Sequence, residues 1–118
     1  MPRKILAAID DMFFAAKVRA TAEALGGSEI KFYRRLDLLV DAANAGLADL
    51  ILVDLHNEKI DPIELAVKLK SAGEAKTELL GFFSHVETDL QRKALEAGYD
   101  QVIPRSVFSR DLAKILGQ

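Results

Sequence analysis

Acidic residues stand directly after two apolar stretches of this sequence, and they are the residues best suited to chemistry. The stretch 50–53 runs into Asp54, and the stretch 4–9 runs into the pair Asp10 and Asp11. An apolar run that ends on a carboxylate indicates either a capped strand end or a reactive group at the rim of a sheet. Carboxylate oxygens suit a hard cation such as Mg²⁺. A carboxylate can also act as a covalent nucleophile.

A hydroxyl and a cation follow two further apolar stretches. Ser84 comes after residues 78–83, and Arg105 comes after residues 101–104. In an open parallel α/β sheet the ligand crevice lies at the carboxyl ends of the strands, so these side chains would share one edge with the acids. A cation there could neutralise a phosphoryl group arriving at one carboxylate. The hydroxyl and the guanidinium would then bind the remaining phosphoryl oxygens.

Short β-like runs alternate with longer segments of helical periodicity, and these elements must position the acids. Glycine follows several of the helical segments, and Asp61 and Pro62 form a helix start in which Asp61 is the N-cap. The expected strands are 4–9, 29–33, 50–54, 78–83 and 101–104. The expected helices are 13–25 (ended by Gly26), 36–45 (Gly46), 62–72 (Gly73), 88–97 (Gly98), and a last one from 109 or 110 to 116.

Strict alternation of strands and helices with short links predicts right-handed crossovers and a parallel sheet covered on both faces. The continuous apolar run 50–53 is typical of a central strand. We therefore predict an α/β fold with a doubly wound, five-stranded parallel sheet in a three-layer sandwich. Residues 1–118 are expected to form a single domain.

Composition excludes several classes of function. The 118 residues are 50% hydrophobic and 29% charged and include no cysteine, so disulfides and thiolate chemistry are ruled out. The formal charge of −2 argues against direct nucleic-acid binding, and the basic residues Lys31, Arg34 and Arg35 are expected to be a solvated strand end. The first apolar run is too short for a signal peptide or a membrane span. A cytoplasmic location without membrane contact is expected.

The ordered set of site residues resembles the receiver domains of two-component response regulators, such as the chemotaxis receiver, over essentially the whole chain. The resemblance is carried by Asp10 and Asp11 after the first strand, by Asp54 in the sequence VDL, and by Ser84 after the fourth strand. The run AGYDQVIPR, which leads through the fifth strand, completes it. The resemblance implies the flavodoxin-like (βα)5 fold.

The same resemblance implies roles for these residues. Asp54 would accept a phosphoryl group, and Mg²⁺ would be held by Asp11, with Asp10 as a competing or additional ligand, by Asp54 and by the backbone carbonyl of His56. Ser84 takes the place of the hydroxyl residue that shifts toward the phosphoryl group. Any enzymatic activity would be at most phosphoryl acceptance and autodephosphorylation.

Three residues depart from the pattern of the family. Arg105 stands at the position of the family's lysine, and Ser106 at that of its proline, while Pro104 comes one residue too early. Arginine keeps the charge but is larger and fork-shaped. Val102 stands at the position of the switch aromatic, and valine cannot swing inward as a ring does. The sequence therefore predicts a divergent receiver or a pseudo-receiver.

Each candidate also has a purely structural interpretation. Asp54 could be a strand-end cap, one of Asp10 and Asp11 could cap the following helix, and Ser84 could do the same for its own helix. Arg105 could be a solvated loop residue. These alternatives stay open at the level of sequence.

The remaining histidines and aromatic residues are interpreted as structural. His56 and His85 lack cysteine partners and are expected to be exposed loop residues rather than catalytic groups. Core or helix packing explains the aromatic residues Phe13, Phe14, Phe82 and Phe83. A small flavodoxin-like ligand binder is disfavoured, because no glycine-rich phosphate loop follows the first strand.

Two functions follow from this interpretation. In the first, a stand-alone receiver-like domain takes a phosphoryl group from a histidine kinase or phosphotransfer protein and signals to a downstream protein target, with homodimerisation as an option. In the second, a pseudo-receiver keeps the fold as a phosphorylation-independent interaction module.

Overall fold

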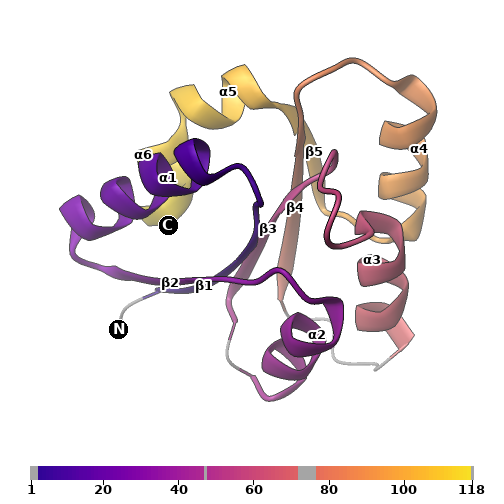
Figure 1. The fold of residues 1–118 in the computed structure, drawn as a ribbon, viewed down its shortest axis with the longest axis horizontal. Coiled ribbons are helices and arrows are strands. Elements are labelled where there is room, and N and C mark those ends of the chain that lie inside the picture. The colour runs from indigo at the N-terminus through magenta and orange to yellow at the C-terminus, as the bar shows by residue number, and fades with distance from the viewer. Residues whose placement is uncertain (1–2, 47, 72–76, 118) are drawn as a thin grey trace.

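The computed structural model describes residues 3–46, 48–71 and 77–117 (Figure 1). Its strands are β1 (Arg3–Ala8), β2 (Ser28–Phe32), β3 (Leu50–Asp54), β4 (Glu78–Phe83) and β5 (Gln101–Pro104). Its helices are α1 (Met12–Leu25), α2 (Leu36–Asn44), α3 (Pro62–Ser71), α4 (Thr88–Ala97), α5 (Arg105–Arg110) and α6 (Leu112–Gly117).

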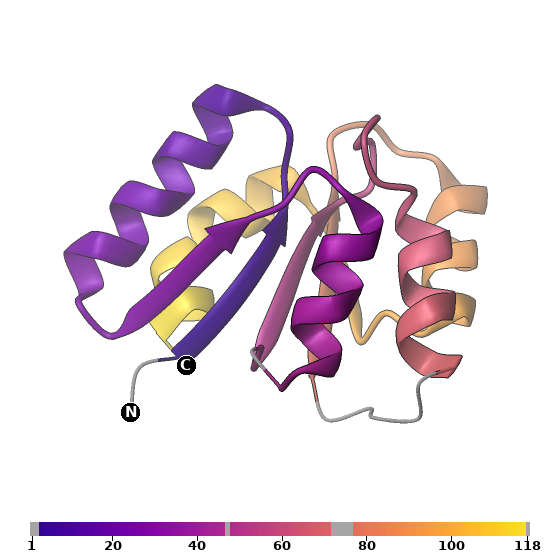
Figure 2. The same cartoon turned by 60° about the horizontal axis from the view of Figure 1, so that its bottom comes forward.

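The strands form one parallel sheet in the order β2-β1-β3-β4-β5. Helices α1, α5 and α6 cover one face, and α2, α3 and α4 cover the other (Figures 1 and 2). The chain order reverses between β1 and β3, which places the topological switch point at the centre of the sheet. The predicted α/β, doubly wound five-stranded fold is confirmed.

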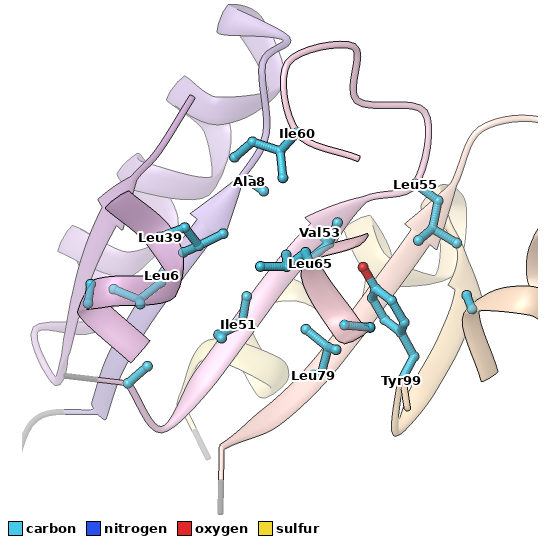
Figure 3. Packing of buried hydrophobic residues seen from close by; sticks show 14 of the residues in the cluster. Leu6, Ala8, Leu39, Ile51, Val53, Leu55, Ile60, Leu65, Leu79 and Tyr99 are labelled. Carbon is cyan, nitrogen blue, oxygen red and sulfur yellow. The ribbon is translucent and has the colours of Figure 1, made fainter. Parts of the chain in front are cut away.

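Alternation along the central strands divides the core into two layers, because successive strand residues point to opposite faces. Leu6 and Ala8 of β1 join the cluster under α2, α3 and α4, which Figure 3 shows from close by. Ile5 and Ala7 join the cluster under α1, α5 and α6. Every residue of β3 is buried, as expected for a central strand covered on both sides.

Helix starts and stops follow the local signals in the sequence. Asp61 is the N-cap of α3, since its Oδ1 accepts hydrogen bonds from the amides of Ile63 at 2.9 Å and Glu64 at 3.2 Å. Gly26 ends α1 in the left-handed region, at φ +70°. The predicted end of the third helix at Ala72 and Gly73 lies outside the described residues.

The prediction for the last helix is wrong. Helix α5 begins at Arg105, directly after the strand, and a break at Asp111 separates it from α6. The ring of Phe108 is fully buried under the sheet, and this tertiary contact extends the helix back to β5. At the break, Asp111 has φ −100° and ψ 14°, and its carboxylate accepts two hydrogen bonds from Arg110.

None of the helices in the described part of the chain is long and apolar enough to cross a membrane.

Candidate functional site at the carboxyl edge of the sheet

Asp54 is the last residue of the central strand β3, and its side chain is turned into the edge of the sheet. Only 6% of the residue is exposed. Its Oδ1 accepts a hydrogen bond from the backbone amide of His56 at 2.9 Å. The next peptide group, the amide of Leu55, donates to the carbonyl of Phe82 at 2.9 Å and so ties the strand end to β4. The carboxylate is therefore held by a backbone amide of its own loop, and the strand end that carries it is held by β4.

The loop after Asp54 is organised by a buried asparagine that sequence analysis gave no role. Asn57 is 8% exposed, and its Nδ2 donates to the carbonyl of Ala8 at 2.9 Å. Its Oδ1 accepts from the amides of Lys59 at 2.7 Å and Ile60 at 3.0 Å. An asparagine three residues after a strand-end aspartate is a turn signal that could have indicated this role. The loop between β3 and α3 is thus bound to the end of β1.

The two acids after β1 have different surroundings. Oδ2 of Asp10 accepts from the amide of Glu58 at 3.4 Å, so Asp10 reaches across to the loop that follows Asp54. Asp11 is the N-cap of α1, and its Oδ1 accepts from the amides of Phe13 at 3.0 Å and Phe14 at 3.2 Å. The structural interpretation of one acid as a helix cap therefore applies to Asp11.

Arg105 reaches the same edge from the first turn of α5. Its Nη2 lies 3.2 Å from Oδ2 of Asp11, and its Cζ lies 3.9 Å from the centre of the Phe14 ring. The side chain of Arg105 is 33% exposed and that of Asp11 is 39% exposed, so the pair is half-buried. Arg105 thus begins a helix and pairs with Asp11 rather than lying in a solvated loop, and its role in a site stays a prediction. A cation that follows β5 and an acid that follows β1 thus meet at the carboxyl edge of the sheet.

The loop between β4 and α4 also lies at this edge of the sheet. Ser84 follows the last residue of β4 and is exposed. The amide of His85 donates to Nε2 of His56 at 3.4 Å, and the two imidazole rings stand 5.4 Å apart. His85 is exposed, as expected, whereas His56 is half-buried against this neighbouring loop. The β3–α3 and β4–α4 loops therefore touch through the two histidines.

Electrostatics connects these residues into one site. Burial raises the pKa of the Asp54 carboxyl above its ordinary value, and the charge of Asp10 adds to this rise. The hydrogen bond from the His56 amide and the charge of Arg105 oppose it. The pKa of Asp11 is lowered, first by its hydrogen bond from the Phe14 amide and then by Arg105. Asp10 and Arg105 are thus both within electrostatic reach of Asp54.

The oxygen atoms at this edge of the sheet are of the chemical type that binds a hard cation. Carboxylate oxygens of Asp10 and Asp54 and the backbone carbonyl of His56 are the oxygen ligands that Mg²⁺ takes, and Mg²⁺ usually keeps several waters beside one or two carboxylates. Within residues 3–46, 48–71 and 77–117, no three acidic or histidine side chains group into a metal centre. A cation would therefore rely on two carboxylates, because Asp11 is already engaged by its helix and by Arg105. Metal ligation by Asp10, Asp11, Asp54 and His56 stays a prediction.

Comparison with known proteins bears on the fold. No protein-family model matches the chain, and no curated protein matches it in sequence. A CheY-like response regulator receiver domain protein from Methanospirillum hungatei JF-1 is 19% identical with a TM-score of 0.82, covering 99% of this chain and 92% of its own. The Francisella response regulator 1452 receiver domain is 19% identical with a TM-score of 0.79, covering 98% and 93%. A response regulator signal receiver domain from Bermanella marisrubri is 16% identical with a TM-score of 0.79, covering 99% and 97%.

The chain therefore has the fold of response regulator receiver domains, over nearly its whole length. The resemblance predicted from the acids at the strand ends is confirmed at the level of fold.

Proposed function

We propose that this chain is a receiver-type signalling domain that accepts a phosphoryl group on Asp54 with the help of Mg²⁺. The observation that carries the proposal is the placement of Asp54. It is a nearly buried carboxylate at the end of the central strand, with Asp10 and Arg105 within electrostatic reach. Burial and a neighbouring acid both destabilise the charged form of a carboxyl group, and a cation that binds beside it stabilises that charged form. A phosphoryl transfer site needs such an arrangement.

The reaction divides among the residues of the edge. The Asp54 oxygen that the His56 amide does not hold attacks the phosphorus of a phosphorylated histidine on a kinase or phosphotransfer protein. The new O–P bond forms as the P–N bond breaks, and the leaving imidazole takes up a proton. When bound, Mg²⁺ supplies positive charge for the phosphoryl oxygens. Ser84 and Arg105 donate hydrogen bonds to the remaining oxygens.

The partners follow from this chemistry. The donor is a histidine kinase or phosphotransfer protein, and the output is a contact with a downstream protein target. Val102, at the position of the family's switch aromatic, is half-buried against the cluster under α2, α3 and α4. A cytoplasmic location and the option of a homodimer stay predictions.

The experiment is phosphorylation by a small donor. The whole chain is incubated with acetyl phosphate and Mg²⁺, and its intact mass is measured. We expect one added phosphoryl group on the wild-type protein and none on Asp54→Asn. Asp49→Asn is the matched control, since Asp49 is an exposed aspartate just before the same strand and should leave the adduct intact. No adduct on the wild type, or an adduct that survives Asp54→Asn, overturns the proposal.

A pseudo-receiver is the second candidate, and a specific contact favours it. Arg105 stands where the family has its lysine, but its guanidinium is held by Asp11 and the Phe14 ring. A chain that keeps this arrangement would use the fold for protein contacts without phosphoryl chemistry. The same mass measurement separates the two candidates, because the pseudo-receiver gives no adduct.

A further inference from the structure

The guanidinium of Arg105 lies between the first turns of two helices, α1 and α5, and contacts both an aromatic ring and a carboxylate. Its Cζ lies 3.9 Å from the centre of the Phe14 ring, a distance typical of a cation–π contact. Its Nη2 lies 3.2 Å from Oδ2 of Asp11. Arg105 is the first residue of α5, and Phe14 belongs to the first turn of α1. One side chain thus joins the starts of both helices at the edge of the sheet.

The Phe14 ring that contacts the guanidinium is held in place by its neighbours. Phe14 is 5% exposed, and its ring centre lies 5.3 Å from that of Phe82 on β4 and 5.8 Å from that of Phe108 on α5. Phe82 and Phe108 are themselves stacked, with ring centres 4.6 Å apart and an interplanar angle of 10°. Because neighbours on two elements hold the ring, the guanidinium rests on a surface that keeps its orientation.

Both carboxylate oxygens of Asp11 are engaged. Oδ1 accepts from the amides of Phe13 and Phe14, and Oδ2 is paired with Arg105. A cation at this edge could use Asp11 only through Oδ2, since giving up Oδ1 would remove the N-cap of α1. Arg105 and a divalent cation therefore compete for the same oxygen.

Arg105 has a second anion within reach. Its charge acts on the buried carboxylate of Asp54 as well as on Asp11. A phosphoryl group on Asp54 would add several anionic oxygens there, and guanidinium groups bind such oxygens in a planar, forked geometry. The residue thus has one partner in the resting state and a stronger one after phosphorylation.

We propose that Arg105 gates the cation site at this edge. While the guanidinium holds Oδ2 of Asp11, a cation has only Asp10, Asp54 and the His56 carbonyl, and its affinity is low. A phosphoryl group on Asp54 draws the guanidinium away and frees Asp11 as a further ligand. This inference rests on the proposed magnesium site, and it makes Arg105 a positioning residue that sets the affinity of that site.

The test uses Mg²⁺ alone, without a phosphodonor, on the whole chain. Calorimetric titration and backbone amide NMR compare the wild type with Arg105→Met, which removes the charge but leaves an apolar side chain over Phe14. We expect about fivefold to tenfold tighter Mg²⁺ binding, the size that the loss of a half-buried ion pair and a cation–π contact gives. Arg105→Lys keeps the charge without the flat fork and should tighten binding by about twofold. Arg105→Lys still tests the proposal if Arg105→Met does not fold.

Two controls separate the gate from a general effect of charge. Arg110→Met removes a cation from the same helix, where it pairs with Asp111, and should leave the affinity unchanged. The gain of Arg105→Met should vanish in an Asp11→Asn background, because the freed oxygen is then no longer a carboxylate. A structural role of Arg105 alone would not depend on Asp11 in this way.

The outcomes are distinguishable. Equal or weaker Mg²⁺ binding by Arg105→Met, or a gain that persists with Asp11→Asn, overturns the gate and leaves phosphoryl acceptance at Asp54 intact. No Mg²⁺ binding by any variant overturns the gate together with the magnesium part of the proposed function. Tighter binding that requires Asp11 supports the gate.

Discussion

The loop after β3 is held by the buried side chains of Asp54, at the end of the strand, and Asn57, which hydrogen-bond to backbone groups. The loop after β4, by contrast, is exposed. Asn57 connects its own loop to β1 through one hydrogen bond to the carbonyl of Ala8, and it accepts two more from amides within the loop. Asp54 accepts a hydrogen bond from the amide of His56. Residues 84–87 are all exposed. Their link to the first loop is the 3.4 Å hydrogen bond from His85 to His56. Both loops lie at the same edge of one parallel sheet.

Under the proposed function, this difference gives the two sides of the site different tasks. The side with Asp54 is held rigidly, so it can present a carboxylate in a constant place. The side with Ser84 has little to hold it, so its hydroxyl can move toward a group that arrives on Asp54. A rigidly placed carboxylate and a movable hydroxyl are compatible, because Asp54 ends β3 whereas Ser84 lies in the loop after β4.

Replacing Asn57 should have the largest effect on stability. In Asn57→Ala the buried amide of Ile60 and the buried carbonyl of Ala8 lose their partner, and so does the part-buried amide of Lys59. We expect the free energy of unfolding to fall by about 2–4 kcal/mol, as for other losses of a buried polar network. Urea denaturation measures it.

Asn44→Ala is the control for this change. Asn44 is an exposed asparagine at the end of α2, and its removal should change the free energy of unfolding by no more than about 0.5 kcal/mol. A loss below about 1 kcal/mol for Asn57→Ala would show that the loop does not depend on its asparagine.

Asp54→Asn should have an intermediate effect that depends on pH. Because burial raises the pKa of Asp54 in the folded state, the folded protein keeps a proton that the unfolded chain has already lost. The wild type therefore loses stability as pH rises from the ordinary value of 3.8 through the folded pKa, and the lost stability stays lost above it. The asparagine variant lacks this loss and still offers an oxygen to the His56 amide.

The measurement is the free energy of unfolding of both proteins across this pH range, with chelator present. We expect the variant to become more stable than the wild type by on the order of 1 kcal/mol toward neutral pH. Mg²⁺ should narrow the gap by stabilising the wild type. A gap that shrinks as pH rises in chelator would contradict the raised pKa.

Ser84→Ala should have the smallest effect on stability and a clear effect on chemistry. Ser84 is exposed, so the free energy of unfolding should stay within about 0.5 kcal/mol of the wild type. Loss of a hydrogen bond to a charged phosphoryl oxygen should slow adduct formation from acetyl phosphate by about tenfold. Ser84→Thr keeps the hydroxyl and should keep the rate. Equal rates for serine and alanine would mean that the exposed loop takes no part in the transfer.

The sequence predicted most of the fold because the relevant signals are local. The apolar run that ends on Asp54 and the start of α3 at Asp61 and Pro62 are visible within a few residues, and the structure has both where the pattern indicates. The prediction for the last helix was wrong because the start of that helix depends on a contact that is not local. The helix begins at Arg105 because Phe108 packs under the sheet, and the sequence does not show which element the ring of Phe108 contacts.

The amino-acid sequence by itself determined which residues stand at the carboxyl ends of the strands, because the periods of strands and helices decide where each strand stops. Only the tertiary structure decided how those residues divide their partners. Asp10 and Asp11 are neighbours with the same side chain, yet one reaches the loop of Asp54 and the other caps α1 and holds Arg105. Arg105 lies 94 positions along the chain from Asp11. A contact over that separation depends on the packing of the whole sheet, so no local pattern of residues can specify it.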